Sequence, residues 1–454
     1  MKQRKYIISS IAIILIILAT ISFTIMANAE NGEVPARVIE DERTIVKISA
    51  SHSIGKSSNQ KVEKATFEEE LNKYAGSGKT TVTEKNSSTL AVTFTETGNE
   101  YEINLNKVPE FENIEIPSIE YTMPYLPSTD FLQLDETSLS TGLVIQDGEG
   151  NQYVWIEVPK TTTVYDNLNY DLDTLTGTAL TNAYIAIETD LKEYTSLYRN
   201  GTTYEDIHSG NDASTGLTSS QYTELKHKML KSVYENGGFY IGRYEAGIST
   251  NRTSHSTISS SLVPTSKANQ YPLTWIYCSE AQTLASRVLT TGEHTSSLMF
   301  GIQWDLVLKY LETKNVVTQT QLNENSMQWG NYINSTYTLN RGKYARYGIL
   351  STWSDYTTDL TGVVENRIKQ SVESGSNTIL YTTGSSDRNS RQKIYDLAGN
   401  VSEWTLEYTS NTNLPCAGRG GVFYNHSSNE PASFRYDNYA NDANFNDGFR
   451  VSIF

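Results

Sequence analysis

The sequence is poor in cysteine, with only Cys278 and Cys416 among 454 residues. Disulfide-stabilised domains are short and rich in cysteine, so that class of fold is excluded. The two thiols could pair in an oxidising compartment, or both could be buried as small apolar side chains. The residues alone leave both alternatives open.

Basic residues are also few, with 36 Lys and Arg against 52 Asp and Glu and a formal net charge of −16. Nucleic-acid phosphates and anionic lipid surfaces would be repelled, so we expect neither as a partner. The six histidines are dispersed, without H-E-x-x-H or H-x-x-E-H spacing, and no P-loop or G-x-S-x-G motif occurs. The sequence therefore lacks the common signatures of hydrolases, metalloproteases and nucleotide-binding enzymes.

Only one long apolar run is present, and it lies at the N-terminus. Lys2, Arg4 and Lys5 precede an uncharged stretch that ends in Ala27-Asn28-Ala29, a small-x-small cleavage pattern. The whole stretch is long enough to span a bilayer. We expect residues 1–29 to be a signal peptide or an N-terminal membrane anchor, and the rest of the chain to be secreted or displayed on the cell surface.

Three regions follow the N-terminal segment. Residues 30–105 predict a small α+β module or stalk, with an amphipathic helix at 64–74 and strands at 80–84, 90–95 and 100–105. Residues 106–138 contain four prolines among acidic residues, which favours an extended linker.

Residues 139–454 predict a large domain of the α+β class. Helices are expected before a region of short strands, and this order argues against a parallel α/β fold. The predicted elements are a hairpin at 142–159, helices at 219–236, 279–289 and 301–314, and a strand at 239–246, with insertion loops at 161–218.

Several short motifs occur in this domain in a fixed order. They are Tyr153-Val154-Trp155-Ile156, Phe239-Tyr240-Ile241-Gly242-Arg243-Tyr244-Glu245, Pro272-Leu273-Thr274-Trp275, Gln303-Trp304-Asp305, the run from Tyr395 to Trp404, Arg419-Gly420-Gly421, Arg435 and Gly448-Phe449-Arg450. The ordered set resembles the formylglycine-generating, sulfatase-modifying-factor family over residues 142–454. The resemblance implies a C-type-lectin-like fold.

The catalytic cysteine pair of that family is missing. The resemblance places two copper-binding cysteines shortly after Gly421, where this chain has Asn425 and Glu430. An amide and a carboxylate do not replace soft thiolate ligands for Cu(I), so we expect no copper and no enzymatic activity of this kind. The alternative is an extracellular enzyme of the same class that acts through other residues.

The resemblance also implies a structural calcium site. Its positions in this chain are Asp396, Gly399, Val401 and Glu403, which would supply carboxylate and carbonyl oxygens. The alternative is that Asp396 caps a turn and Glu403 is solvated.

Residues 422–447 have an unusual composition in which aromatic residues alternate with asparagine, as in antibody binding loops. Lys, Glu, Gln, Trp and Met are absent there except for Glu430. Adenine-directed mutagenesis of AAC codons cannot produce these five types, so the segment is similar to the variable proteins of diversity-generating retroelements. We therefore expect a hypervariable site that binds an extracellular protein or glycan. Its candidate residues are Phe423, Tyr424, Asn425, His426, Ser427, Phe434, Tyr436, Asn438, Tyr439, Asn441, Asn444 and Phe445.

Overall fold

A computed structural model divides the chain into two compact units, Met1–Thr122 and Met123–Phe454. It describes residues 23–25, 36–38, 80–86, 89–94, 100–104, 124–135, 137–199, 204–208, 210–335, 337–356, 368–369 and 378–454. Within these residues, no helix combines the length and the apolar composition that crossing a bilayer requires.

The described residues of the smaller unit form two antiparallel sheets. Strands β1 (Phe23–Ile25) and β2 (Ala36–Val38) form one pair. Strands β3 (Thr80–Asn86), β4 (Thr89–Phe94) and β5 (Glu100–Asn104) form the other sheet, in sequence order. The three predicted strands are therefore confirmed. The predicted helix at 64–74 and most of the predicted N-terminal signal or anchor lie outside the described residues.

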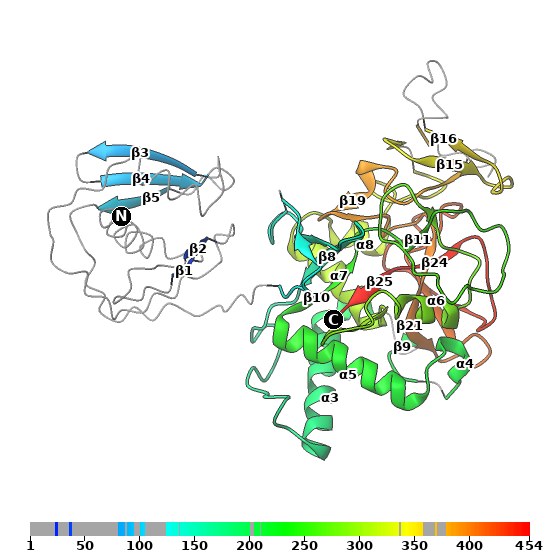
Figure 1. Ribbon diagram of the computed structural model, residues 1–454, viewed down its shortest axis with the longest axis horizontal. Helices are drawn as coiled ribbons and strands as arrows, with labels where there is room; N and C mark the ends of the chain where they lie inside the picture. The colour runs from blue at the N-terminus through cyan, green and yellow to red at the C-terminus, as the bar shows by residue number, and fades with distance from the viewer. Residues whose placement is uncertain are drawn as a thin grey trace. The chain divides into compact units, whose positions relative to one another are not determined.

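The larger unit has a six-stranded antiparallel sheet in the order β13-β25-β10-β8-β7-β6. Its strands β8, β10 and β25 are labelled in Figure 1. Its members are β6 (Leu132–Gln133), β7 (Val144–Gln146), β8 (Gln152–Glu157), β10 (Gly238–Gly242), β13 (Ser296–Leu298) and β25 (Val451–Ile453). The C-terminal strand β25 is therefore an inner strand of this sheet. Because β6 pairs with β7 and Phe131 is buried in the core, the unit includes residues that the sequence had placed in the linker.

The hairpin predicted at 142–159 is confirmed as β7 and β8. Asp147 closes its turn, because one carboxylate oxygen accepts hydrogen bonds from the backbone amides of Glu149 at 3.0 Å and Asn151 at 2.8 Å. Such a side-chain-to-backbone bond is what makes aspartate a turn residue.

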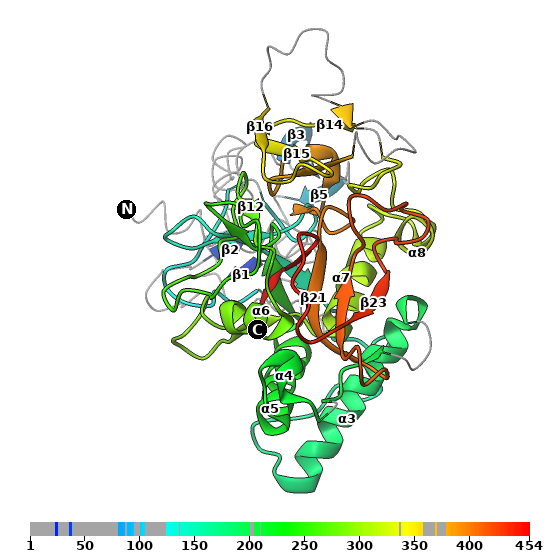
Figure 2. The same cartoon turned by 90° about the vertical axis from the view of Figure 1, so that its right-hand side faces the viewer.

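A second sheet carries the C-terminal segment. Its strands are β9 (Tyr204–Glu205), β21 (Ser402–Thr409), β22 (Cys416–Arg419), β23 (Arg435–Asn438) and β24 (Asp447–Phe449). The order is β23-β22-β21-β24, with β9 also on β21, and only the β21–β24 pair is parallel. Figure 2 shows β21 and β23 close to helix α7 (Gly301–Thr313).

The helices confirm three predictions and correct one. Helix α5 (Ser219–Asn236) begins after a Thr218 capping box and ends before Gly237, which has a φ of 73°. Helices α6 (Cys278–Ala285) and α7 lie where helices were expected. The prediction of insertion loops throughout 161–218 was wrong, because α3 (Gly177–Tyr194) buries Ala183, Tyr184, Ile187 and Leu191 and packs on α5.

The remaining described elements are short. They are η1 (Ser196–Tyr198), α4 (Asp212–Thr215), β11 (Gly247–Ile248), β12 (Tyr271–Pro272), α8 (Gln319–Asn323), β14 (Tyr337–Thr338), β15 (Lys343–Arg346), β16 (Trp353–Asp355), β17 (Ile368–Lys369), β18 (Ile379–Tyr381), η3 (Asp387–Asn389), β19 (Ser390–Arg391) and β20 (Ile394–Tyr395). Helices together with mostly antiparallel sheets confirm the α+β class.

Candidate ligand-binding surface

The C-terminal segment is attached to the protein interior by buried arginines. Arg419 ends β22 and Arg435 begins β23, and the two residues are paired across these strands. Arg419 contacts Asp305 at 2.8 Å and Glu407 at 3.2 Å, while Arg435 contacts the same carboxylates at 2.7 and 3.0 Å. Two positive charges therefore meet two negative charges away from water, which is the condition for a tolerable buried ion pair.

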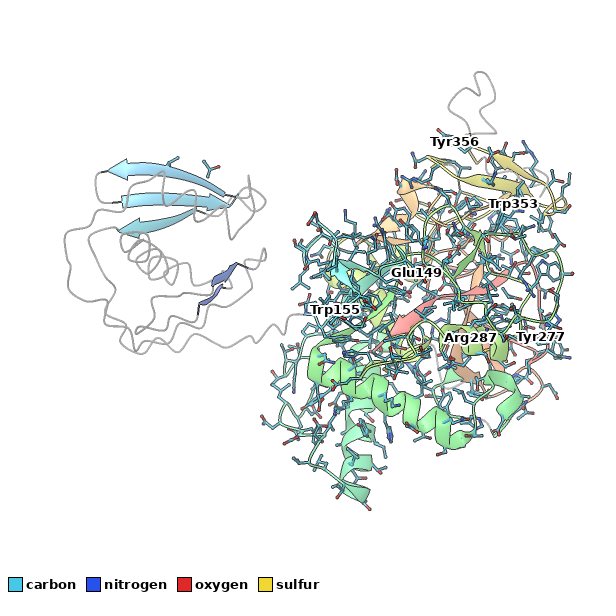
Figure 3. All side chains as sticks on the ribbon, viewed as in Figure 1. Glu149, Trp155, Tyr277, Arg287, Trp353 and Tyr356 are labelled. Carbon is cyan, nitrogen blue, oxygen red and sulfur yellow. The ribbon has the colours of Figure 1, made fainter. Side chains whose placement is uncertain are left out.

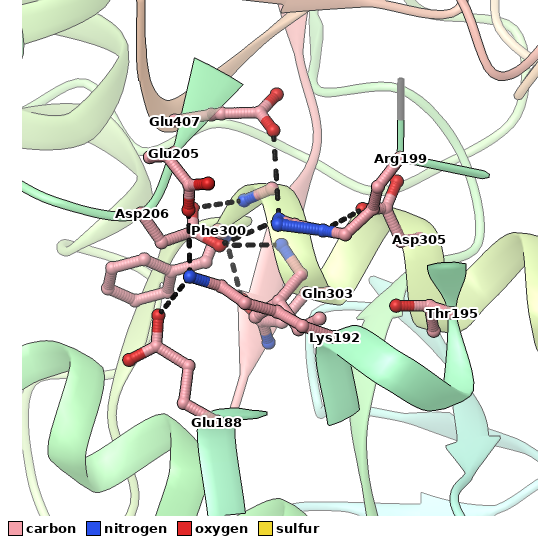
Figure 4. Close-up of polar contacts among 12 residues, drawn as sticks. Glu188, Lys192, Thr195, Arg199, Glu205, Asp206, Phe300, Gln303, Asp305 and Glu407 are labelled. Atoms are coloured by element: carbon pink, nitrogen blue, oxygen red, sulfur yellow. Dashed lines mark hydrogen bonds and ion pairs between the residues drawn. The ribbon is translucent and has the colours of Figure 1, made fainter. Parts of the chain in front are cut away.

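Arg199 and Asp206 extend this cluster from Asp305 to the N-terminus of α7 (Figure 4). The guanidinium of Arg199 donates to Asp305 at 3.1 Å and lies 3.6 Å from Asp206. Both oxygens of Asp206 accept hydrogen bonds from the first amides of α7, Gly301 at 2.7 Å and Ile302 at 2.8 Å. A remote loop thus caps the helix that supplies Asp305. Burial raises the pKa of Asp206 to about 6.

The four predicted calcium positions lie in one buried region, where Asp396 and Glu403 each have protein partners. The Asp396 carboxylate accepts from the Gly384 amide at 2.7 Å and from the Tyr381 hydroxyl at 3.3 Å. Both Glu403 oxygens accept from Arg450, at 2.7 and 3.1 Å.

The other two predicted calcium positions, Gly399 and Val401, would contribute backbone atoms. Gly399 has a φ of 71°, and the Val401 amide donates to the buried carboxylate of Glu245. Across the described residues, no group of three or more His, Cys, Asp and Glu side chains is arranged to hold a metal. Calcium at Asp396 and Glu403 stays a prediction, and its alternative of a solvated Glu403 does not fit a side chain that is about 1% exposed.

The two positions that would carry copper-binding cysteines are in direct contact. The side-chain amide of Asn425 donates to one oxygen of Glu430, and the other oxygen accepts from the Val422 backbone amide at 3.2 Å. Burial raises the pKa of the Glu430 carboxyl, which the hydrogen bond from Asn425 only partly offsets. The two side chains therefore bridge the loop that follows Gly421. The atoms at the bridge are hard nitrogen and oxygen rather than soft sulfur.

The twelve predicted ligand-binding residues differ in exposure. The exposed ones are His426, Tyr439 and Asn441; the buried ones are Phe423 and Ser427; and the half-buried ones are Tyr424, Asn425, Phe434, Tyr436, Asn438, Asn444 and Phe445. Ser427 bonds to Asn325 and Asn334, and the Tyr436 hydroxyl bonds to buried Asp447. These two side chains hold the segment in place rather than face solvent.

Three of the predicted residues form an aromatic surface together with residues from elsewhere in the chain. Phe423 forms the buried base, and the ring centroids of Tyr424 and Phe445 lie 5.2 and 6.2 Å from it. Tyr347, which is 39% exposed, lies 5.1 Å from Tyr424, and Trp275 lies 6.3 Å from Phe445. We call these five residues the aromatic surface. Trp353, labelled in Figure 3, packs against the same cluster.

Trp275 has a strained backbone at the edge of this surface. Its φ of 58° lies in the left-handed region, which is unfavourable for a bulky side chain. The strain is held by neighbours, because the Trp275 amide donates to the Asn444 carbonyl at 2.9 Å and its carbonyl accepts from Arg252 at 3.0 Å. Sequence reasoning missed Trp275 and Tyr347 as site residues, because both join the segment only through long-range contacts.

A small polar pocket adjoins the middle of the segment. It has a volume of about 260 Å³ and is lined by Tyr204, Asn323, Ser428, Asn429, Pro431, Ser433, Phe434 and Arg435. Of these, Phe434 belongs to the predicted ligand-binding set, so the segment faces both a polar pocket and an aromatic surface.

Comparisons with known proteins give little guidance. No protein-family model and no curated protein sequence matches the chain. Among solved structures, Treponema denticola variable protein 1 is similar, with 12% sequence identity, over 48% of this chain and 84% of that one. Its TM-score of 0.24 is too low to establish a shared fold.

Proposed function

We propose that the chain is an exported ligand-binding protein, secreted or displayed on the cell surface. Its larger unit would be a non-catalytic C-type-lectin-like domain of the formylglycine-generating type, and residues 422–447 would present a hypervariable binding site. The ligand would be a protein or a glycan outside the cell. The observation that carries the proposal is the half-exposed aromatic surface, since large rigid rings beside polar side chains suit recognition.

The arrangement of buried and exposed residues supports a diversified site on a constant frame. The motif residues Asp305, Arg419, Arg435 and Arg450 are in the interior ion pairs described above. Exposed side chains such as His426, Tyr439 and Asn441 occur between them. Changes in side-chain volume destabilise close-packed interiors but are tolerated at surfaces. The exposed residues of such a segment can therefore vary in sequence without unfolding the domain.

The contact between Asn425 and Glu430 supports a non-catalytic domain. A two-cysteine copper site would need its two positions to be neighbours, and in this chain the neighbouring positions hold an amide and a carboxylate. The rival proposal is an extracellular enzyme of this class. Conversion of a sulfatase-motif cysteine peptide to formylglycine by the purified chain with copper would favour the rival.

A saturation scan of residues 420–450, displayed on cells and scored for folding, tests the proposal. The exposed positions should accept most residues, while Gly421, Gly448 and Phe449 should not. Uniform intolerance across 422–447 would identify a purely structural segment and exclude a hypervariable site. A near-copy of the last hundred bases beside a reverse transcriptase gene, in the DNA downstream, would independently support diversification.

A further inference from the structure

The loop that connects β23 to β24 contains oxygen-bearing side chains at alternate positions. Asp442, Asn444 and Asn446 follow this spacing, and Asp447 and Gly448 come next. Calcium-binding loops of the D-x-[DN]-x-[DN]-G type place oxygen ligands at the same alternate positions. Here Asp447 stands at the sixth position and the glycine at the seventh, so the pattern is similar but not identical.

The side chains of this loop converge in the structure. The Asn444 amide nitrogen donates to both oxygens of Asp442, at 2.8 and 2.9 Å. The Asn446 amide nitrogen donates to one oxygen of Asp447 at 3.1 Å. Side-chain amides of the loop therefore contact both carboxylates, in positions that a cation would also favour.

Asp447 has unsatisfied capacity to bind a cation. Its side chain is fully buried, and its Oδ2 atom has no hydrogen-bond partner. Its Oδ1 atom accepts from the Tyr436 hydroxyl and from the Asn446 amide. Among the described residues, no Lys, Arg or His side chain is ion-paired with Asp442 or Asp447. An unpaired buried carboxylate is costly unless a positive charge joins it.

We propose that Asp442, Asn444 and Asp447 form a calcium-binding site, with the Asn446 amide as a further ligand. Rotating the amide groups by 180° presents Oδ1 in place of Nδ2, so all four side chains can offer hard oxygen atoms. Two carboxylates match the charge of one divalent cation. Calcium suits this set better than magnesium, because it accepts flexible geometry and a larger number of oxygen ligands.

The site is joined to the aromatic surface through the backbone. The Asn444 carbonyl accepts from the Trp275 amide at 2.9 Å, and the Asn446 carbonyl accepts from the Ser402 amide at 2.7 Å. Phe445, between these two residues, belongs to the aromatic surface. Calcium would therefore fix the loop that presents Phe445 and supports the strained backbone of Trp275.

Calorimetric titration of the metal-free full-length chain with calcium chloride tests the proposal without any ligand of the aromatic surface. Asp442→Asn and Asp447→Asn should each weaken calcium binding about tenfold or more, because each removes one ligand charge. Asn444→Asp adds a charge and should tighten binding by a similar factor, which a misfolded protein could not do. Asp437→Asn is the matched control, since Asp437 lies in the adjacent strand β23 and should leave the affinity unchanged.

Asp396→Asn separates this site from the calcium position predicted from the sequence. It should leave the affinity of the loop site unchanged. No calcium binding by the parent chain at millimolar concentration, unchanged affinity in both Asp442→Asn and Asn444→Asp, or a loss confined to Asp396→Asn would each overturn the proposal. Because the titration contains no other ligand, its outcome is separate from that of the proposed binding function.

Discussion

Arg450 and Glu403 form a two-point ion pair in the interior of the larger unit. Nη2 of Arg450 lies 2.7 Å from Oε1 of Glu403, and Nε lies 3.1 Å from Oε2. The guanidinium also donates to the carbonyls of Gly242 and Tyr395, each at 2.9 Å. One residue thus links the end of the chain to β10, β20 and β21.

Removal of this arginine should destabilise the larger unit strongly. We expect Arg450→Met to cost about 3–5 kcal/mol of unfolding free energy, because it leaves a buried carboxylate without its partner. Arg341→Met is the control, since its pair with Asp387 is partly exposed to solvent and should contribute under about 1 kcal/mol. Urea unfolding followed by tryptophan fluorescence reports on this unit alone, because all six tryptophans lie beyond residue 122. Equal losses in both variants would contradict the expectation.

Two glycines with positive φ should differ in their tolerance of alanine. Gly421 has a φ of 76°, and an added Cβ would lie 2.5 Å from the Glu430 carbonyl oxygen. Gly348 has a φ of 85°, and its Cβ would meet nothing within 4 Å. Gly348→Ala should therefore cost only backbone strain, about 1–2 kcal/mol. Gly421→Ala should cost clearly more, and a smaller loss at Gly421 in thermal unfolding would show that its loop adapts.

Alanine substitutions in and around the aromatic surface should show which side chains stabilise the fold and which act mainly in binding. Phe423→Ala should cost about 3–5 kcal/mol, because its side chain is fully buried. Replacing the half-buried Tyr424 or Phe445 by alanine should lower the unfolding free energy by roughly 1–2 kcal/mol each. Replacing the exposed His426 should change it by no more than about 0.5 kcal/mol. Tyr436 should behave like a structural residue, since its ring lies against Gly418. The same urea experiment measures these values, and a full loss of stability in Tyr424→Ala would exclude a role mainly in binding.

The two cysteines should be unreactive in the folded protein. Both thiols are free and about 1% exposed, and the hydrogen bond with Cys416 raises the pKa of Cys278 well above its usual value, as does burial. The reactive thiolate of Cys278 is therefore scarce, and both thiols are shielded from reagents by burial. A maleimide should label neither cysteine in buffer and both in urea, as counted by mass spectrometry. Failure to label in urea without reductant would instead reveal a disulfide.

The pH dependence of stability should include a contribution from Asp206. Its pKa is raised by burial to about 6 in the folded chain, so the folded state holds this proton more tightly than the unfolded state does. The contribution to stability is then greatest at low pH and is lost as the pH rises from about 4 to about 6. The charged groups that act on it are Arg199, Glu188 and Glu407. Unfolding curves across this range should be flatter for Asp206→Asn, and an identical slope would show that Asp206 ionises normally.

The sequence by itself determined the elements that depend on local signals. Helix α5 could be predicted from hydroxyl side chains able to cap its start and from its terminal Gly237, and the β7–β8 hairpin from the turn chemistry of Asp147. Helix α3 was missed because its narrow apolar stripe lies within a polar, threonine-rich stretch, and it becomes stable only when Ile187 and Leu191 are buried.

Only the tertiary structure decided which side chains form the candidate sites. Tyr347 and Trp275 join Tyr424 and Phe445 from distant parts of the chain, and periodicity along a sequence carries no information about such contacts. Tyr436 and Ser427 belong to the same segment of unusual composition as their exposed neighbours, yet their side chains point inward. Tyr436 is held by a hydrogen bond to Asp447. Ser427 is held by hydrogen bonds to Asn325 and Asn334. Side-chain direction in an irregular loop depends on which buried partner each polar group must reach, and that is a property of the folded chain.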